Sequence, residues 1–210
     1  MIKHLILDLD NTLYSARYGL EKEVSRRIEV FLSGTLGLSR DESEDTHRSL
    51  IREQGYGTTI EWLMAEKGFT DIDGYYAAIY PENEGEVLQS DPSLREFLES
   101  IPLPKAILTN APQIHADNIL DRLGIKDVFQ YIFDIRLNNY RGKPHREAFS
   151  LALQKMGAQP GSTLFVDDYP EFVAGFVKFG GKAVLMDEFG RFSDLPFSRI
   201  KSIYEITAFL

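Results

Sequence analysis

Carboxylates gather at two points of the sequence, each at the end of a short apolar run. Asp8 and Asp10 end the first run, and Asp167 and Asp168 follow a second one far along the chain. Two acids separated by one residue on an extended chain point in roughly the same direction, so they can share a cation or divide nucleophilic and acid–base roles. Adjacent acids against an apolar strand repel one another unless a cation is present. Together the four form a hard-oxygen site suited to Mg²⁺.

A hydroxyl group and a cation follow two other apolar runs. Thr109 offers a hydroxyl donor, and the backbone N–H of Asn110 lies near a predicted helix start, where an anion is favoured. Asn110 is also interpreted as the N-cap of that helix, with Pro112 in its first turn. Lys143 precedes another predicted helix, and Pro144 at the first helical position would fix where Lys143 points. A lone lysine is usually a solvated surface charge, so its role depends on the neighbouring motifs.

Short apolar runs that end in polar residues predict buried strands. Amphipathic helical patterns separate these runs, which indicates a Rossmann-like α/β fold, a parallel sheet with helices on both faces. The carboxyl ends of such strands meet at one edge, where ligands bind. The predicted strands are His4 to Leu9, Ala106 to Leu108, Tyr131 to Ile135, Thr163 to Val166 and Ala183 to Met186, and the helices between the later strands are Asp91 to Glu99, Gln113 to Leu123, His145 to Met156 and Pro170 to Phe179.

The segment after the first strand has helical spacing and no convincing strand. Its roughly 75 residues are far more than one crossover helix needs, which favours a separate all-helical cap over helices packed on the sheet. We therefore predict a cap domain over residues 14–88 and an α/β core domain over residues 1–13 and 89–210. The predicted cap helices run near Arg17 to Leu32, Asp41 to Gln54, Thr59 to Lys67 and Ile72 to Tyr80.

Composition limits the classes of partner. The 210 residues include 23 Lys and Arg against 32 Asp and Glu, a net charge of −9, and no cysteine. The acidic balance argues against a nucleic-acid polymer as partner, and the lack of thiols leaves oxygen or histidine ligands for a metal. The N-terminus turns acidic after a very short apolar run, and no segment approaches the ~20 apolar residues of a membrane span. We expect a cytoplasmic protein with a small-molecule partner; oligomeric state has no sequence signal.

The order DLDNT, TNA, KP and DD, with a helical insertion after the first motif, resembles the haloacid dehalogenase (HAD) superfamily of phosphohydrolases. The resemblance covers nearly the whole chain and implies that Asp8 is a nucleophile that forms an aspartyl-phosphate. It implies that Asp10 acts as general acid and then as general base, and that Lys143 offsets the charge that the phosphate shares with Asp8. Thr109 and the amide of Asn110 would bind the phosphoryl oxygens.

The resemblance also implies an Mg²⁺ site. Asp8, the backbone carbonyl of Asp10, and Asp168 would be its ligands, with Asp167 as a further ligand or held through water. Phosphoryl transfer depends on positioning and on cations that offset negative charge, which agrees with this set of residues.

Finer motifs look like the pyrimidine 5′-nucleotidase group, which dephosphorylates nucleoside monophosphates such as UMP and CMP. The group's pattern includes DNTLY, a YGTT segment in the cap and His115 after the TNA motif; Tyr56 of YGTT is our candidate for substrate binding. The chain departs from the group after its Asp pair, where Tyr169 and Pro170 replace the usual small polar residue and Asn. His115 is expected to be a surface residue or a support behind the site.

Three alternatives remain at this point. A phosphatase or phosphomutase for a sugar phosphate or for phosphoglycolate would keep all four motifs. Dehalogenation is disfavoured by Asp10 and by the metal-binding acids, which that chemistry does not need. A non-catalytic binding module with this fold is disfavoured because only chemistry requires the whole set together.

Overall fold

A single parallel sheet of six strands organises the chain in the computed structural model, which describes residues 1–50 and 53–210 in full. The strand order is β3-β2-β1-β4-β5-β6, and every neighbouring pair is parallel. The α/β fold with a parallel sheet is therefore confirmed. The strands are β1 (His4–Leu7), β2 (Lys105–Leu108), β3 (Tyr131–Phe133), β4 (Thr163–Asp167), β5 (Lys182–Met186) and β6 (Arg199–Ile200).

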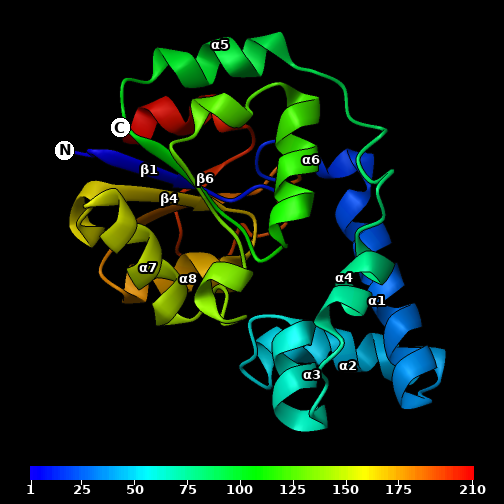
Figure 1. Ribbon diagram of the computed structural model, residues 1–210. Coiled ribbons are helices and arrows are strands. Elements are labelled where there is room, and N and C mark those ends of the chain that lie inside the picture. Colours follow the sequence, from blue (N-terminus) through cyan, green and yellow to red (C-terminus); the bar gives the residue numbers. More distant parts are fainter.

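Helices cover both faces of the sheet, because alternate strand residues point to opposite sides. Leu5 and Leu7 pack with the apolar residues of α5 (Pro92–Ser100) and α6 (Gln113–Leu123). Ile6, which lies between them, packs with α7 (Arg146–Met156) and α8 (Pro170–Lys178) on the other face. Figure 1 shows these two helical layers, with both chain termini on the side of the sheet away from the helical segment that follows β1.

Five α-helices lie between β1 and β2, and the first four extend to one side of the sheet (Figure 1). We call this segment the helical insert: α1 (Leu20–Leu36), α2 (Arg40–Arg52), α3 (Thr59–Lys67) and α4 (Ile72–Ile79). The described residues of this segment include no strand, and the apolar side chains of the four helices form a buried cluster that includes Trp62 and that Ile135, from the loop after β3, joins from the core side. A separate cluster favours the predicted division into cap and core domains, which stays a prediction.

Short 3₁₀ helices complete the chain: η1 (Ala16–Tyr18), η2 (Lys126–Val128), η3 (Arg136–Asn138), η4 (Pro160–Ser162) and η5 (Ile203–Phe209). Within the described residues, none of the helices combines the length and apolarity that a membrane crossing requires.

The strand order places a topological switch between β1 and β4. From β1 the chain runs outward through β2 and β3, and it then returns to the other side of β1 for β4, β5 and β6. The connections therefore leave in opposite directions at this point, and a crevice opens there beyond the carboxyl ends of the strands. The two predicted acidic motifs follow these two strands, so the fold brings them to this crevice.

Candidate active site

A buried lysine joins the two acidic motifs. The Nζ atom of Lys143 lies 2.6 Å from Oδ1 of Asp8 and 2.6 Å from Oδ2 of Asp167. The parallel register pairs Leu7 with Val166, so the next residue of each strand brings Asp8 and Asp167 side by side. Only 1% of the Lys143 side chain is exposed, so this lysine is not the solvated surface charge that a lone lysine usually is.

Three acids form a group that can hold a cation. Carboxylate oxygens of Asp8, Asp167 and Asp168 all lie within 4.8 Å of one another. Asn11 supports the group, since its amide nitrogen donates to Oδ2 of Asp168 at 3.1 Å and also to Glu21 of α1. The predicted ligand positions at both strand ends are thus close together, and the side chain of Asp10 lies outside this group.

The acids of this group share an excess of negative charge. Burial raises the pKa of Asp8 to about 8, even though the Lys143 charge opposes that rise; the charges of Asp167 and Asp10 add to it. Burial also raises the pKa of Asp167 and, with the Asp167 charge beside it, that of Asp168. One lysine does not offset three clustered carboxylates, two of them buried, so the site favours a further cation.

Asp10 is held by a different set of contacts. Its Oδ1 atom lies 2.8 Å from Nε2 of His115 and accepts a hydrogen bond from the Tyr14 hydroxyl at 2.5 Å. Burial raises the pKa of Asp10, but the charge and hydrogen bond of His115 and the Tyr14 hydroxyl outweigh burial and lower it. His115 was expected at the surface or behind the site; it is 1% exposed, which excludes the surface.

Asn110 shapes the loop that carries Lys143. Its Oδ1 atom accepts from the Lys143 backbone N–H at 2.7 Å, and its Nδ2 atom donates to the Lys143 carbonyl at 2.8 Å. The predicted N-cap role of Asn110 is wrong, because Pro112 is the N-cap of α6 and the N–H of Gln113 donates to Asp134 instead. The amide therefore fixes the loop backbone, and through it the direction of Lys143.

The start of α7 also differs from its prediction. His145 is the N-cap and the helix begins at Arg146, so Pro144 lies before the helix and not at its first position. His145 instead contacts the helical insert, with Nε2 2.8 Å from Oε2 of Glu61. This contact and the bond from Asn110 Nδ2 to the Gly57 carbonyl at 3.3 Å join the insert to the Lys143 loop.

Gly57 permits this close approach. A Cβ atom at Gly57 would lie 2.5 Å from the backbone oxygen of Lys143, so only glycine fits without a shift of the backbone. The YGTT segment that the sequence singled out therefore supplies a backbone contact to the core at Gly57.

A cavity extends from the acids into the helical insert. Asp8, Asp10, Thr109, Asn110, Lys143 and Asp168 line it on the sheet side, so the structure brings these predicted residues to one cavity; Asp167 lies beneath, bonded to Lys143. Thr109 is 3% exposed, and its Oγ1 accepts from the Ala111 N–H at 3.0 Å. Tyr56 is outside the lining, and its hydroxyl donates to Glu66.

The insert side of the cavity is largely apolar and aromatic. On this side, His47 lies between two hydroxyl groups, with Nδ1 3.0 Å from Oγ1 of Thr59 and Nε2 3.4 Å from Oγ of Ser25. Burial lowers the pKa of His47 to about 4, so the ring is neutral near pH 7. The lining residues from the insert and its return segment are Glu21, Val24, Ser25, Ile28, His47, Leu50, Gly57, Thr58, Thr59, Ile60, Tyr75, Tyr76 and Tyr80.

Four further residues support the site from behind; of these, the sequence analysis proposed such a place for His115 and missed Tyr14, Glu21 and Glu84. Tyr14 and His115 hold Asp10, Glu84 contacts His115, and Glu21 contacts Asn11. Tyr14 and His115 stood in the finer motifs, but nothing in the spacing linked them to Asp10. Glu84 and Glu21 carry no sequence signal, because they lie on helices or loops far from the strand ends.

A family model described as "Hydrolase: haloacid dehalogenase-like hydrolase" matches residues 2–180. Similar curated proteins include glyceraldehyde 3-phosphate phosphatase of Methanocaldococcus jannaschii, 27% identical over 80% of this chain and 77% of that protein. Phosphate metabolism protein 8 of Saccharomyces cerevisiae is 26% identical over 85% of this chain, which spans 59% of that longer protein. Phosphoglycolate phosphatase of Pectobacterium atrosepticum is 26% identical over 80% of this chain and 72% of that protein.

Solved structures share the fold. The HAD phosphatase from Thermococcus onnurineus superposes with a TM-score of 0.63 at 21% identity, over 99% of this chain and 97% of that one. The L-2-haloacid dehalogenase from Xanthobacter autotrophicus, with chloropropionic acid covalently bound, also gives 0.63 at 16% identity, over 99% and 98% of the two chains. At these identities the similarity concerns the arrangement of helices and strands.

Proposed function

The chain belongs to the haloacid dehalogenase-like hydrolases, and we propose that it is an Mg²⁺-dependent phosphatase for small phosphomonoesters, preferably pyrimidine nucleoside 5′-monophosphates. The observation that carries the proposal is Lys143, buried with its Nζ 2.6 Å from both Asp8 and Asp167, next to an acid group that fits a cation. A carboxylate can attack a phosphate dianion only where such positive charge offsets the repulsion.

Asp8 and Asp10 divide the chemistry in this proposal. An oxygen of Asp8 attacks phosphorus, the bond to the ester oxygen breaks, and Asp10 gives its proton to that oxygen. Asp10 then takes a proton from water, which attacks phosphorus of the aspartyl-phosphate and frees phosphate and Asp8. A phosphate anion beside Asp10 raises the pKa of Asp10, which favours its protonation while substrate is bound. Thr109 and the backbone amide of Asn110 bind the phosphoryl oxygens.

Asp8, Asp167 and Asp168 would hold the Mg²⁺, since their oxygens lie within 4.8 Å of one another and oxygen ligands suit that ion. The ion supplies charge that stabilises the phosphoryl group as it is transferred. The backbone carbonyl of Asp10 completes the proposed ligand set. The raised pKa values of these three acids are the expected property of a site built for a further positive charge.

The curated relatives support phosphatase chemistry, because two of those compared above are named as phosphatases of small phosphorylated compounds. Dehalogenase neighbours share the fold, but dehalogenation makes no use of Asp10 or of an acid group suited to a cation. A phosphomutase would keep the same residues and would need a bisphosphate for activity. These points favour hydrolysis of a phosphomonoester.

The insert side of the cavity favours an uncharged leaving group. Among the described residues that line the cavity, Lys143 and His115 are the only basic groups besides the neutral His47. Both already contact carboxylates of the protein, so neither is free for an acid group of the substrate. A glycolate carboxylate would lose its solvation there without a cationic partner, whereas a nucleoside offers a ring for the tyrosines and polar edges for Ser25 and Thr59. This lining supports a nucleoside 5′-monophosphate over phosphoglycolate; a sugar phosphate is the second candidate.

Phosphate release from a panel of substrates tests the proposal. We expect kcat/KM for UMP and CMP to exceed that for sugar phosphates by about tenfold or more, because a missing favourable contact changes affinity by about that factor. Phosphoglycolate should be the poorest substrate of the panel. Equal rates for UMP and sugar phosphates would reject the nucleotidase part alone, and no release from any phosphomonoester would reject the whole proposal.

Cation removal should change both activity and stability. EDTA is expected to abolish phosphate release, and added Mg²⁺ is expected to restore it. In EDTA, the contribution of Asp8 to folding stability should fall as pH rises from about 4 through about 8, because its pKa is raised in the folded protein and the native state binds the extra proton. Mg²⁺ should raise the Tm more at pH 8 than at pH 5. If Mg²⁺ left the Tm unchanged at both pH values, the result would contradict the metal site.

A further inference from the structure

His115 lies on α6 and touches two acids from different parts of the chain. Its Nε2 atom is 2.8 Å from Oδ1 of Asp10, and its Nδ1 atom is 2.7 Å from Oε2 of Glu84. Each ring nitrogen therefore lies within hydrogen-bond distance of a carboxylate oxygen, which fixes the ring between the two acids. The side chains of His115 and Glu84 are 1% and 2% exposed, so this pair is buried.

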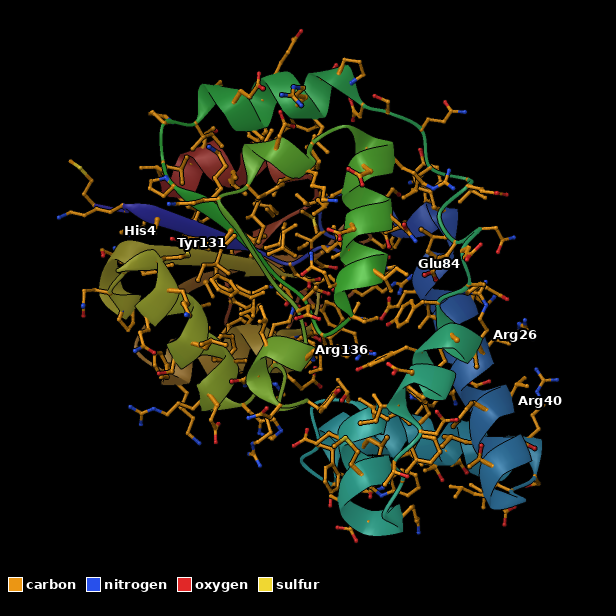
Figure 2. All side chains as sticks on the ribbon, in the orientation of Figure 1. His4, Arg26, Arg40, Glu84, Tyr131 and Arg136 are labelled. Atoms are coloured by element: carbon orange, nitrogen blue, oxygen red, sulfur yellow. The ribbon has the colours of Figure 1, made fainter. Side chains whose placement is uncertain are left out.

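Glu84 anchors this pair to the helical insert. The residue lies in the segment that returns from α4 to α5, and Nη1 of Arg27 on α1 donates to its Oε1 at 3.2 Å. The same Arg27 nitrogen donates to the Ile79 carbonyl at the end of α4 at 3.0 Å. Figure 2 shows the labelled Glu84 beside α1 and facing α6. The Tyr80 ring packs on His115 with a centroid distance of 4.6 Å, which fixes the plane of the imidazole.

These contacts act on one oxygen of Asp10. Oδ1 takes the hydrogen bonds of both His115 and Tyr14, whereas Oδ2 has no hydrogen-bond partner in the described part of the chain. Asp10 lines the cavity with 26% of its side chain exposed, so Oδ2 is the oxygen left for solvent and substrate. We propose that His115 and Glu84 are positioning residues that fix the Asp10 carboxylate so that Oδ2 handles the proton of the leaving oxygen.

This inference rests on the proposed phosphatase reaction and deepens it. When the ester bond breaks, the proton on Oδ2 goes to the leaving oxygen, and Oδ2 later takes a proton from the attacking water. A carboxylate that rotates freely spends less time aimed at either atom, so its fixation raises the rate of both transfers. The pair also holds the return segment of the insert, which carries Glu84, close to α6 and to Asp10.

A comparison of two aryl phosphates tests the positioning role. Phenyl phosphate and p-nitrophenyl phosphate have similar shapes, but only the weakly acidic phenol needs a proton as it leaves. We expect His115→Ala to lower kcat/KM for phenyl phosphate by about 100-fold and that for p-nitrophenyl phosphate by less than about tenfold. His115→Gln, whose amide can still donate to Asp10, should recover part of the loss. Glu84→Gln should show a smaller defect of the same selectivity.

The controls separate a loss of positioning from a loss of folding. Ile119→Ala removes a buried side chain of the same helix, and any loss of activity it causes should be equal for the two substrates. Asp10→Asn defines the largest selective loss that the acid can produce. Equal losses for both substrates in His115→Ala and Glu84→Gln would overturn the inference. A wild-type enzyme that releases phosphate neither from these two esters nor from UMP would instead reject the proposed function.

Discussion

Asp8→Asn is expected to abolish phosphomonoester turnover and to leave the fold intact. The amide cannot form the aspartyl-phosphate, and loss of a nucleophile lowers kcat by about 10⁴-fold or more in enzymes with covalent intermediates. The fold should tolerate the change because Asn keeps an oxygen for the Lys143 hydrogen bond and removes one of the three clustered negative charges. Phosphate release at saturating UMP, with circular dichroism as the check on folding, measures both effects.

A matched control lies at the end of β5, which β4 separates from β1 in the sheet. Asp187 follows β5 and is also buried, but its carboxylate accepts from the Arg191 and Phe192 N–H groups and lies outside the cavity of Asp8. Asp187→Asn should therefore keep its activity per folded molecule. Acid-quenched wild-type enzyme should carry one phosphoryl group on the peptide that contains Asp8. Turnover by Asp8→Asn at a tenth of the wild-type rate would exclude the covalent route.

Short-range patterns were enough to predict most of the elements. The predicted bounds of α3 and α6 agree with the structure, because each helix has a strong local end signal: Thr58 caps α3, and Gly124 ends α6 with a positive φ. The edge strand β6 was not predicted, since two residues, Arg199 and Ile200, are too few to show a period. Its place follows from pairing with β5, which is a tertiary contact.

The residues at the strand ends of the candidate site could be predicted for a topological reason. Parallel strands bring their carboxyl ends to one edge, so polar residues at strand ends meet whatever the helices between them do. No comparable rule predicts which residues contact Asp10. His115 is separated from Asp10 by 105 residues and from Glu84 by 31, and only the packing of α6 against the return segment of the insert brings the three together.

Asn110 shows why a local pattern can mislead. Its position before Pro112 is typical of a helix cap, yet the buried Asp134 accepts from the Gln113 N–H and leaves the amide free for the Lys143 loop. Tyr56 shows that a motif also cannot predict substrate contacts residue by residue. Of the two neighbours of Gly57, Thr58 lines the cavity and Tyr56 does not. Both cases depend on contacts between segments far apart in the sequence.

Lys143→Met is expected to lower kcat by about 10³-fold and to destabilise the protein in EDTA. The lysine is the described cation nearest to Asp8, and the loss of one group that stabilises developing charge costs about 10²- to 10³-fold in rate. Removal of one partner from a buried ion pair costs about 3–5 kcal/mol where the remaining charge is uncompensated. Proton uptake by Asp8 and Asp167 offsets part of that cost at low pH.

The pH dependence gives this prediction its sign. Without Lys143, the pKa values of Asp8 and Asp167 rise further, because Lys143 lowers both in the wild type. A carboxylate whose pKa is raised in the folded state stabilises folding at low pH and loses that contribution as pH rises through the folded pKa. The urea midpoint of Lys143→Met should therefore lie further below the wild-type value at about pH 8 than at about pH 5.

Lys105→Met is the control for Lys143→Met, because it removes a buried lysine that lies outside the candidate site. Lys105 begins β2 at the opposite end of the sheet, is 7% exposed, and donates to the carbonyls of Ile101 and Leu103. Its replacement should lower the urea midpoint without a selective effect on kcat, because it neutralises no carboxylate of the site. If both variants lost stability and activity in the same proportion, Lys143 would be a structural lysine and the electrostatic basis of the proposed reaction would fail.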